Sequence, residues 1–290
     1  MLGLLRFLRL HLLLALTFSL PAFANRLKDK FDYYPDSFYE AVENGTNGTS
    51  LREALFDILS QAHIPQTGQG DRLIKSCPSS AKNCYKHTSL GYTAARTILF
   101  GELHLERYGS NYAIRDVYCQ HLSVPKDYSR NPPGPGQIPD PEVLNAEHTW
   151  PQSKFSSRFD VMLQKSDLHI LYPVLAEANT SRSNNEFNEV VTTVTSPCPL
   201  SKRGYSNTGN NIYFEPPESH KGNAARAIFY FAIRYKMPVS AAQEASLRAW
   251  HHKDPPDDFE RHRNEVIFAK QKVRNPFIDH PELVDLIPEF

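Results

Sequence analysis

Residues 145–153 read NAEHTWPQS and place an acidic side chain, Glu147, directly before a histidine, His148. With an unperturbed pKa of ~6.5, a histidine can accept a proton at neutral pH. A glutamate carboxylate is a hard oxygen ligand for a divalent cation. The pair therefore predicts a site in which a proton acceptor lies beside a bound metal ion.

The position of this pair in the chain raises a geometric question. Neighbouring side chains of a regular strand point to opposite faces, so Glu147 and His148 could not then share a site. Pro151 indicates that a strand through the pair ends there. We therefore expect the backbone around Glu147 to depart from regular strand geometry. The alternative is that only one of the two side chains faces the site.

A second polar block, residues 166–184, supplies further candidates. A helix over 174–185 would place Asn179 and Arg182 on one face, three residues apart. Asn179 would add an amide oxygen to the carboxylate of Glu147. Arg182 would lie near a phosphate, whose oxygens suit the planar fork of an arginine. The alternative for Arg182 is a solvated arginine on the surface.

Two other polar residues lie close to these blocks. Arg158 follows the acid–histidine pair and is a second candidate for a catalytic contact to phosphate. His169 adjoins an apolar run over 170–172, which favours a structural role for it, hydrogen-bonded within the core.

One carboxylate and one amide oxygen are too few ligands for a closed structural metal site. They suit Mg²⁺, which keeps several waters and is completed by substrate phosphate oxygens; Mn²⁺ and Ca²⁺ are the alternatives, with one ion per site. A metal held by Glu147 and Asn179 would polarise a phosphoryl oxygen, and His148 would activate a water as general base. These residues predict hydrolysis of a phosphodiester bond in a nucleic acid.

The N-terminus has the pattern of an export signal. Two arginines precede a short apolar run, and residues 22–24 read AFA, a small-residue cleavage site. The run is too short for a membrane helix, which takes ~20 residues. We expect a signal peptide at 1–24 and one catalytic domain over 25–290. The mature protein would be periplasmic or secreted and would have no membrane segment.

The chain holds 32 basic and 32 acidic residues, and its predicted signal peptide carries two of the basic ones. A nearly neutral molecule lacks the broad basic surface typical of many nucleic-acid-binding proteins. Any phosphate site must therefore be a local cluster of basic side chains. We expect a monomer whose macromolecular partner is its nucleic-acid substrate, DNA or RNA or both.

The four cysteines, Cys77, Cys84, Cys119 and Cys198, all follow the predicted signal peptide. An even count in an oxidising compartment predicts two disulfides. Among the three possible pairings, we favour Cys77 with Cys84, which would close a short polar loop and leave Cys119 with Cys198. A zinc site is the alternative, but no pair has the close Cys-x-x-Cys spacing of zinc ligands.

The remaining sequence predicts an α+β fold, a mostly helical single domain with a small antiparallel sheet. A capping box at 50–53 predicts the start of a helix with a buried stripe. The Ala- and aromatic-rich segment 224–235 predicts a helix that is buried on most sides. Six prolines argue against a helix or a central strand over 124–141. Further helices are expected at 92–103, 240–250 and 257–271, a strand at 113–119, and loops at 62–90 and 200–220.

Taken together, the motifs resemble the signature of the endonuclease I family, and the similarity extends over most of the expected mature chain. The ordered set is far more specific than any one of its members. The matching motifs are DVYC at 116–119, EHTWP at 147–151, SDLH at 166–169, EAN at 177–179, RSN at 182–184 and RNPF at 274–277.

The resemblance implies an exported bacterial nuclease with a ββα-metal (His-Me finger) site, in which two strands and a helix carry the catalytic residues. It implies largely non-specific cleavage of DNA, RNA or both with a divalent metal. It places the general base on His148 and the metal ligands on Glu147 and Asn179. Part of the family has an arginine on a longer, cysteine-bearing insertion after the acid–histidine motif, where this chain has a short segment with only Arg158 nearby.

Two other functions remain open from the sequence. One is a ribonuclease with little action on DNA; the 2′-hydroxyl could distinguish the two substrates, but no residue indicates a contact to it. The other is a non-catalytic envelope protein that binds nucleic acid. The joint presence of Glu147, His148 and Asn179 argues against the second, because binding alone would not need all three.

Overall fold

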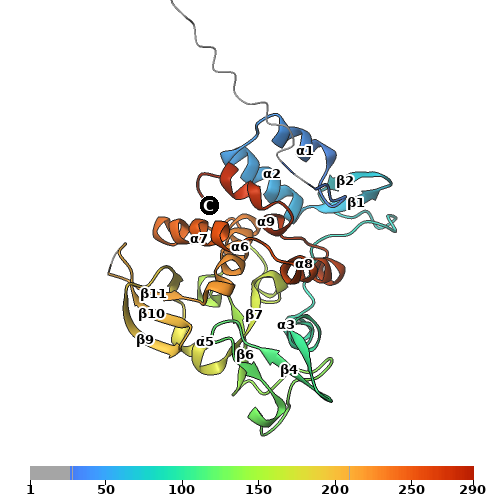
Figure 1. The fold of residues 1–290 in the computed structure, drawn as a ribbon. Helices are drawn as coiled ribbons and strands as arrows, with labels where there is room; N and C mark the ends of the chain where they lie inside the picture. The colour runs from blue at the N-terminus through green and yellow to red at the C-terminus, as the bar shows by residue number, and fades with distance from the viewer. Residues whose placement is uncertain (1–26, 28, 209) are drawn as a thin grey trace, which may run out of the picture.

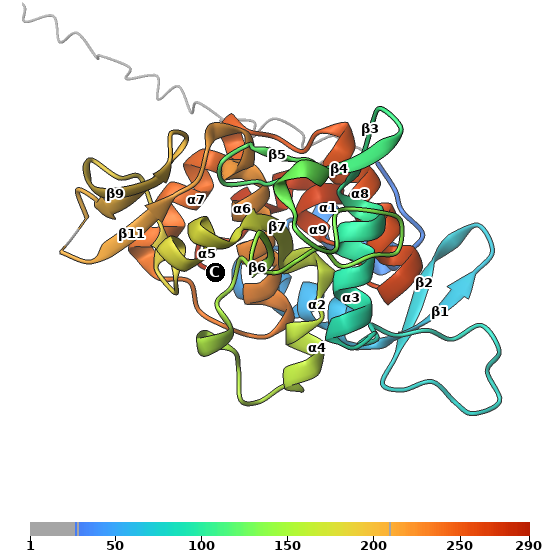
Figure 2. The ribbon, with the colours of Figure 1, turned by 90° about the horizontal axis from the view of Figure 1, so that it is seen from below.

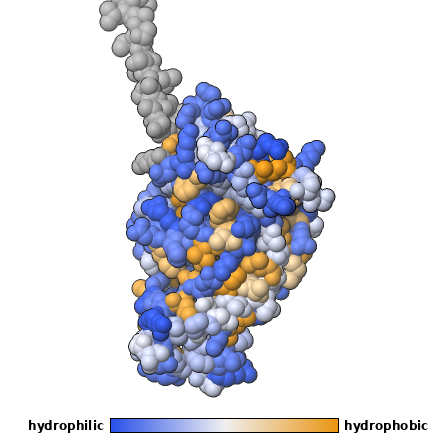
Figure 3. All heavy atoms as spheres, turned by 90° about the vertical axis from the view of Figure 1, so that its right-hand side faces the viewer, coloured by the Kyte–Doolittle hydropathy of each residue, from blue (hydrophilic) through white to orange (hydrophobic). Residues whose placement is uncertain are grey.

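The computed structural model of the protein describes residues 27, 29–208 and 210–290 (Figure 1). The signal peptide predicted for 1–24 lies outside the described residues. Within these residues, no helix is long and apolar enough to cross a bilayer. The face of the molecule in Figure 3 is mainly hydrophilic, in keeping with a sequence in which 22% of the residues are charged.

A long helix, α6 (Glu218–Arg234), lies at the centre of the core, and nearly all of its side chains from His220 onward are buried. The prediction of a helix buried on most sides at 224–235 is therefore confirmed. The other helices are α1 (Asp36–Glu43), α2 (Gly48–Ser60), α3 (Tyr92–Ile98), α4 (Val161–Lys165), α5 (Ala176–Arg182), α7 (Ala241–Lys253), α8 (Asp258–Gln271) and α9 (Pro276–Asp279).

The strands of the described chain form small separate sheets, so helices and sheets are mixed as the predicted α+β class requires. The pairings are antiparallel except that β8 runs parallel to β11. The sheets are β1 (Ala62–Gln66) with β2 (Gln69–Ile74); β3 (Leu105–Tyr108), β4 (Asn111–Arg115) and β5 (Leu122–Ser123); β6 (Leu144–His148) with β7 (Leu171–Leu175); and β8 (Glu186–Phe187), β11 (Ile212–Glu215), β10 (Ser201–Tyr205) and β9 (Thr192–Cys198).

The β6–β7 pair carries the acid–histidine motif, and α5 follows directly after β7. Its antiparallel register is continuous, with Glu147 opposite Tyr172 and His148 opposite Leu171. In both Figure 1 and Figure 2, β6 and α5 lie between the β9–β11 sheet on one side and α3 on the other. The motif is thus flanked by two separate parts of the fold.

Two of the predicted loops contain strands. Residues 62–90 include the β1–β2 hairpin, and residues 200–220 include β10 and β11. The loop prediction failed for the β1–β2 hairpin because its segment is mainly polar, whereas its strands are held together by backbone pairing from Ala62 with Ile74 to Gln66 with Gln69. It failed for β10 because that strand has no aliphatic side chain, so no apolar alternation marks it.

Three predicted element boundaries were also wrong. Helix α2 begins at Gly48, so Ser50 lies inside it and forms no capping box. Helix α5 is shorter than 174–185, because β7 occupies the chain up to Leu175 and Ser183 takes a positive φ of 55° that ends the helix. Strand β4 ends at Arg115, before the residues predicted to complete it. The helices expected at 92–103, 240–250 and 257–271 are present, the first continuing as a π-helical turn over Leu99–Leu103.

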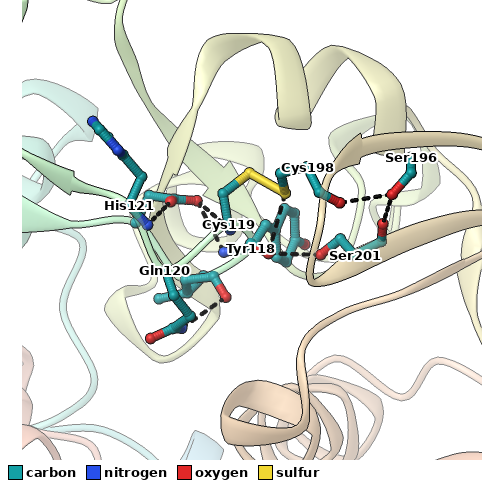
Figure 4. Close-up of a disulfide and its surroundings, with 9 residues drawn as sticks. Tyr118, Cys119, Gln120, His121, Ser196, Cys198 and Ser201 are labelled. Carbon is teal, nitrogen blue, oxygen red and sulfur yellow. Dashed lines mark hydrogen bonds between the residues drawn. A yellow bond between two sulfur atoms is a disulfide. The ribbon is translucent and has the colours of Figure 1, made fainter.

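The two disulfides join Cys77 to Cys84 and Cys119 to Cys198, as the sequence predicted. The second links the turn after β4 to the end of β9, across a separation of 79 residues. Figure 4 shows how it lies beside Tyr118, whose carbonyl oxygen accepts a hydrogen bond from the Ser201 hydroxyl at 2.7 Å.

Candidate active site

His148 is the last residue of β6, and its imidazole is held through both ring nitrogens. Nε2 lies 2.9 Å from the carbonyl oxygen of Lys165, and because a carbonyl oxygen only accepts, Nε2 carries the proton. Nδ1 therefore has a lone pair, to which the Gln152 side-chain amide donates at 3.2 Å. The rings of Tyr92 and Phe155 pack against the imidazole, with centroids at 5.6 and 5.8 Å.

The environment keeps this imidazole neutral. Burial lowers the pKa of His148 to about 4, and the charges of Lys165 and Arg182 act in the same direction. The Lys165 carbonyl opposes them by accepting from the protonated ring. At pH 7 the ring is thus neutral and can accept a proton at Nδ1.

The carbonyl that holds His148 belongs to Lys165 at the end of α4, and the residues directly after it are held by the helical core. Gln271 of α8 donates to the Ser166 carbonyl oxygen at 2.8 Å and accepts from the Leu168 N–H at 2.8 Å. The buried carboxylate of Asp167 accepts from two tyrosine hydroxyls at 2.9 and 2.8 Å. The tautomer of the imidazole is therefore set by distant parts of the sequence.

Glu147 is 4% exposed and is held by two donors. Its Oε1 accepts from the Tyr118 hydroxyl at 3.1 Å and from Nη1 of Arg182 at 2.8 Å. Burial raises the pKa of the Glu147 carboxyl, while the Arg182 charge and the Tyr118 hydroxyl lower it. Both of these donors meet the same carboxylate oxygen, which fixes the orientation of the side chain.

Arg182 is 1% exposed, and its guanidinium bonds inside the protein. Besides Glu147, it donates to the carbonyl oxygens of His148 at 3.0 Å and Thr149 at 2.7 Å. It also stacks on the ring of Phe187, with its carbon 4.7 Å from the centroid. Arg182 thus joins α5 to the end of β6, which is a structural contact that the sequence did not predict. It is not the solvated surface arginine of the alternative.

The amide of Asn179 can be oriented by following a chain of hydrogen bonds. The Asn145 side chain bonds to the Pro141 carbonyl oxygen, which can only accept, so the Asn145 amide nitrogen faces Pro141. Its Oδ1 must then accept from the Asn179 amide nitrogen, at 3.2 Å. This assignment leaves the Asn179 Oδ1 for another partner.

An open cavity of about 320 Å³, which we call the active-site cavity, brings four of the predicted site residues together: Glu147, His148, Asn179 and Arg182 line it. Arg158, the fifth, does not line it. The exposed Arg158 side chain instead donates to the Lys236 carbonyl oxygen at 2.7 Å. The other lining residues are Ala146, Pro151, Gln152, Ser153, Ser183 and Asn184.

The expectation of an irregular backbone around Glu147 is wrong, because the pairing of β6 with β7 continues without a register shift to His148. Both residues nevertheless line the cavity. We attribute this to the end of the strand. His148 is the last residue of β6 and the chain bends at Thr149 and Trp150, so residues on both sides of this bend line the cavity.

Several residues of the site escaped prediction from the sequence. Tyr118 holds Glu147, Gln152 contacts His148, and Asn145 orients Asn179. Tyr118 stood within a motif that carried the resemblance, which was the only signal for it. A backbone carbonyl such as that of Lys165 has no sequence signal. His169 is buried and bonds the Val273 carbonyl oxygen at 3.2 Å, in agreement with the structural role predicted for it.

Among the described residues, no group of three or more His, Cys, Asp or Glu side chains could hold a metal ion. The pair of Glu147 and Asn179 therefore differs in composition from a zinc site built of several His, Cys, Asp or Glu ligands. A neutral imidazole oriented beside such oxygens in an open cavity is an arrangement suited to hydrolysis. The chain belongs to the endonuclease I family: the model of that family matches residues 79–282. The resemblance to this family that the sequence motifs indicated is therefore confirmed.

Similar proteins carry the names of nucleases. An extracellular ribonuclease of Bacillus subtilis (strain 168) is 29% identical over 87% of this chain and 78% of its own length. An extracellular ribonuclease of Bacillus amyloliquefaciens is 31% identical over 49% of this chain and 53% of its own. A periplasmic deoxyribonuclease of Aeromonas hydrophila is 30% identical over 43% of this chain and 51% of its own. The last two matches thus span about half the length of those relatives.

Proposed function

We propose that the protein is an exported, metal-dependent and largely sequence-non-specific endonuclease that hydrolyses phosphodiester bonds in DNA, RNA or both. The observation that carries the proposal is the imidazole of His148. Its Nε2 proton is fixed on a carbonyl oxygen, and Nδ1 can accept a proton at the active-site cavity. Membership of a nuclease family and the names of the relatives support the same reaction.

In this proposal His148 is the general base. Nδ1 takes a proton from a water molecule whose oxygen attacks the phosphorus, and the Lys165 carbonyl stabilises the imidazolium through the Nε2 proton. The P–O bond to one sugar oxygen breaks, and that oxygen leaves with the released strand and takes a proton from water. The side-chain amide of Gln152, which donates to Nδ1 in the substrate-free protein, would give way to that water. Gln152 is exposed, so this exchange requires no rearrangement of the core.

Glu147 and Asn179 would hold one divalent metal ion, Mg²⁺ or, alternatively, Mn²⁺ or Ca²⁺. The residues fit such an ion, because Glu147 and Asn179 line the same cavity, the bond to Asn145 leaves Oδ1 of Asn179 for another partner, and carboxylate and amide oxygens are hard ligands. When bound, the ion would act as a Lewis acid toward a phosphoryl oxygen. Arg182 would position Glu147 rather than contact the phosphate. The contact predicted for Arg158 remains a prediction, since its side chain lies outside the cavity.

We further propose that β6, β7 and α5 form the ββα-metal unit that the family resemblance implies. The base and the carboxylate come from the end of β6, and the amide comes from α5, which follows β7 directly. Two disulfides and the names of exported relatives support a periplasmic or extracellular location. The single domain over 25–290, the monomeric state and the absence of a membrane segment from the mature protein stay predictions.

A preference for RNA is a second candidate within the same reaction. The relative that matches over 87% of the chain is named an extracellular ribonuclease. Parallel digestion of plasmid DNA and of single-stranded RNA would decide between the two, with rates compared across Mg²⁺, Mn²⁺ and Ca²⁺. A rate on RNA that exceeds the rate on DNA by about a hundredfold in each metal would establish the preference; a hundredfold corresponds to ~2.7 kcal/mol of discrimination.

The proposed function is tested with the mature protein, nucleic acid and a chelator. We expect cleavage with Mg²⁺, no cleavage with EDTA, and at least a hundredfold loss of rate in His148→Ala, because a positioned histidine base contributes roughly 10²–10⁴-fold. His252→Ala is the matched control, since His252 is largely exposed and outside the cavity. Cleavage that persists in EDTA would exclude the metal, and an active His148→Ala protein with native circular dichroism would exclude the base.

A further inference from the structure

Two further cavities adjoin the active-site cavity, one on each side. The first, which we call the α3 cavity, measures about 240 Å³ and shares Ala146, Gln152 and Asn179 with the active-site cavity. The second, the β9 cavity, measures about 450 Å³ and shares Ser183 with it. Figure 2 shows the same order in the ribbon, from the β9–β11 sheet across α5 and β6 to α3.

Arg96 of α3 lines the first of these cavities. Within the described chain, its guanidinium makes no ion pair or hydrogen bond, and its Nε is buried without a partner. It lies over the ring of Tyr92, 4.8 Å from the centroid, and the ammonium of Lys165 lies 4.7 Å from the same centroid. An arginine so placed has its charge and donors available for an anion.

Arg203 of β10 lines the second cavity, and its guanidinium likewise makes no ion pair or hydrogen bond among the described residues. The cavity is otherwise small and polar: hydroxyl groups from α5 and from β9 border it. The hydroxyls of Thr180 and Ser196 already donate to backbone carbonyl oxygens, so Ser181, Ser183 and Thr195 are the candidate hydroxyl donors for phosphate oxygens. Its remaining lining residues are Thr180, Ser181, Ser183, Thr195, Ser196 and Pro197.

The charges along the three cavities are unevenly distributed. Their lining residues include three arginines but one carboxylate, that of Glu147, which is already paired with Arg182. Elsewhere in the described structure, Arg130 and Arg274 are paired with acidic side chains, whereas the unpaired Arg72 and Arg158 lie exposed outside the three cavities. In a molecule with equal numbers of acidic and basic residues, two unpaired arginines on one line are a local anion-binding feature.

We propose that the backbone of the substrate lies across α5. Arg96 binds a phosphate on one side of the scissile phosphate, and Arg203 binds a phosphate on the other side. This inference rests on the proposed function and extends it, because it assigns the binding of nucleic-acid polymer to two residues outside the active-site cavity. The scissile phosphate would lie between them, beside His148. Neither arginine touches the reacting atoms, so both are binding residues.

The test measures binding rather than cleavage, in the His148→Ala background. A fluorescein-labelled single-stranded oligonucleotide is titrated with protein at several salt concentrations, followed by fluorescence anisotropy. We expect Arg96→Ala and Arg203→Ala each to weaken binding roughly tenfold, because a hydrogen-bonded charge contributes about 1.5 kcal/mol. Each should also reduce the slope of log K against log salt by about 0.7, the value for one phosphate on a single strand.

Arg72→Ala is the matched control. Arg72 of β2 is exposed and lines none of the three cavities, yet its loss removes the same charge. Binding affinity and salt slope should stay unchanged in Arg72→Ala, while Arg96→Lys and Arg203→Lys should keep the salt slope of the His148→Ala protein. Arg96→Ala and Arg203→Ala proteins that bind the oligonucleotide as tightly as Arg72→Ala would overturn the proposal. So would a His148→Ala protein that does not bind the oligonucleotide. Cleavage by the wild-type protein is scored separately, so a failure of this inference is distinguishable from a failure of the proposed function.

Discussion

At the scale of single residues, Arg182 and Glu147 form an ion pair that is almost completely withdrawn from water, with side chains 2% and 5% exposed. A buried pair contributes little net stability relative to apolar residues, but removing one partner leaves an uncompensated charge in a low-dielectric interior. The same arginine holds two carbonyl oxygens at the end of β6. The pair therefore fixes both the carboxylate and the strand end from which the base projects.

The pair predicts a large effect for Arg182→Ala. We expect it to lower the free energy of unfolding by about 3–5 kcal/mol, because the Glu147 carboxylate stays buried without its partner. Urea unfolding followed by fluorescence measures this difference. Arg158→Ala is the control and should change stability by less than about 0.5 kcal/mol, since Arg158 is exposed.

A double variant separates the charge from the packing of the arginine. Glu147→Gln in the Arg182→Ala background removes the unpaired charge and should recover part of the lost stability. An Arg182→Ala protein as stable as Arg158→Ala would contradict the role of the pair. A double variant less stable than Arg182→Ala would show that packing rather than charge dominates.

At the scale of elements, the Cys119–Cys198 disulfide connects the site to the four-stranded sheet. It joins the turn after β4 to the end of β9, and the turn carries Tyr118, the hydroxyl donor to Glu147. In Figure 4 the Tyr118 backbone lies beside both the disulfide and Ser201. The Cys77–Cys84 disulfide, by contrast, closes a separation of seven residues in a segment outside the cavity.

The two disulfides should therefore differ in effect when each is removed by serine substitution. In the chain-entropy model, a loop of about 80 residues is worth roughly 4 kcal/mol and one of about seven residues roughly 2 kcal/mol. We expect Cys119→Ser/Cys198→Ser to lose about twice the unfolding free energy of Cys77→Ser/Cys84→Ser. Only the first variant should also lose nuclease activity under conditions in which it remains folded.

Urea unfolding and plasmid cleavage, measured on the same preparations, check both parts of this prediction. Equal nuclease activity in the two variants would show that the Cys119–Cys198 disulfide does not position Glu147. A larger loss of stability in the Cys77→Ser/Cys84→Ser protein would contradict the dependence on loop length.

At the scale of the whole molecule, several buried histidines couple the stability of the fold to pH. Burial lowers the pKa of His251 and His280 to about 4 and that of His220 to about 3. Between those values and the unfolded value of ~6.5, the unfolded chain binds more protons than the folded one. Their contribution to stability is therefore complete above about pH 6.5 and falls as the pH falls toward 4. Buried carboxyls with a raised pKa, such as Asp167, act in the opposite direction.

His251 allows this coupling to be measured for one residue. Its Nε2 lies 3.0 Å from the Pro281 carbonyl oxygen, and its buried Nδ1 has no partner among the described residues, so a second proton there would be unpaired. In His251→Gln, which does not titrate, stability should fall less steeply with acid. We expect the difference in unfolding free energy between wild type and variant to change by about 3 kcal/mol from pH 7 to pH 4.

Urea unfolding of both proteins across this pH range gives the comparison, in which the other titrating groups cancel. Parallel curves would mean that His251 is protonated in the folded protein at the same pH as in the unfolded chain. A wild type that loses less stability in acid than the variant would mean that the folded protein raises the pKa of His251 instead of lowering it.

Helical periodicity predicted the buried stripe of α2, because its apolar residues recur on a local 3.6-residue repeat. The Ala- and aromatic-rich composition of its segment predicted the buried central helix α6. Local chemistry could not predict β10, whose residues pair with β9 and β11 through backbone atoms. It also missed the boundary of α5. The strand β7 before it and the positive φ of Ser183 after it depend on neighbours elsewhere in the fold.

Sequence alone established the chemical groups of the candidate site: the acid–histidine stretch supplied Glu147 and His148 at the end of a strand, the second polar block supplied Asn179 and Arg182, and the ordered set of motifs indicated the family. Only the tertiary structure decided what those groups do to one another. The Lys165 carbonyl lies against Nε2 of His148, so the proton of the neutral ring is on Nε2. Arg182 is buried and donates to Glu147 inside the protein. The physical reason is that the sequence specifies the type of each side chain, whereas its burial and hydrogen-bond partners depend on segments that are far away in sequence. The turn that carries Tyr118 and the helix α8 are examples.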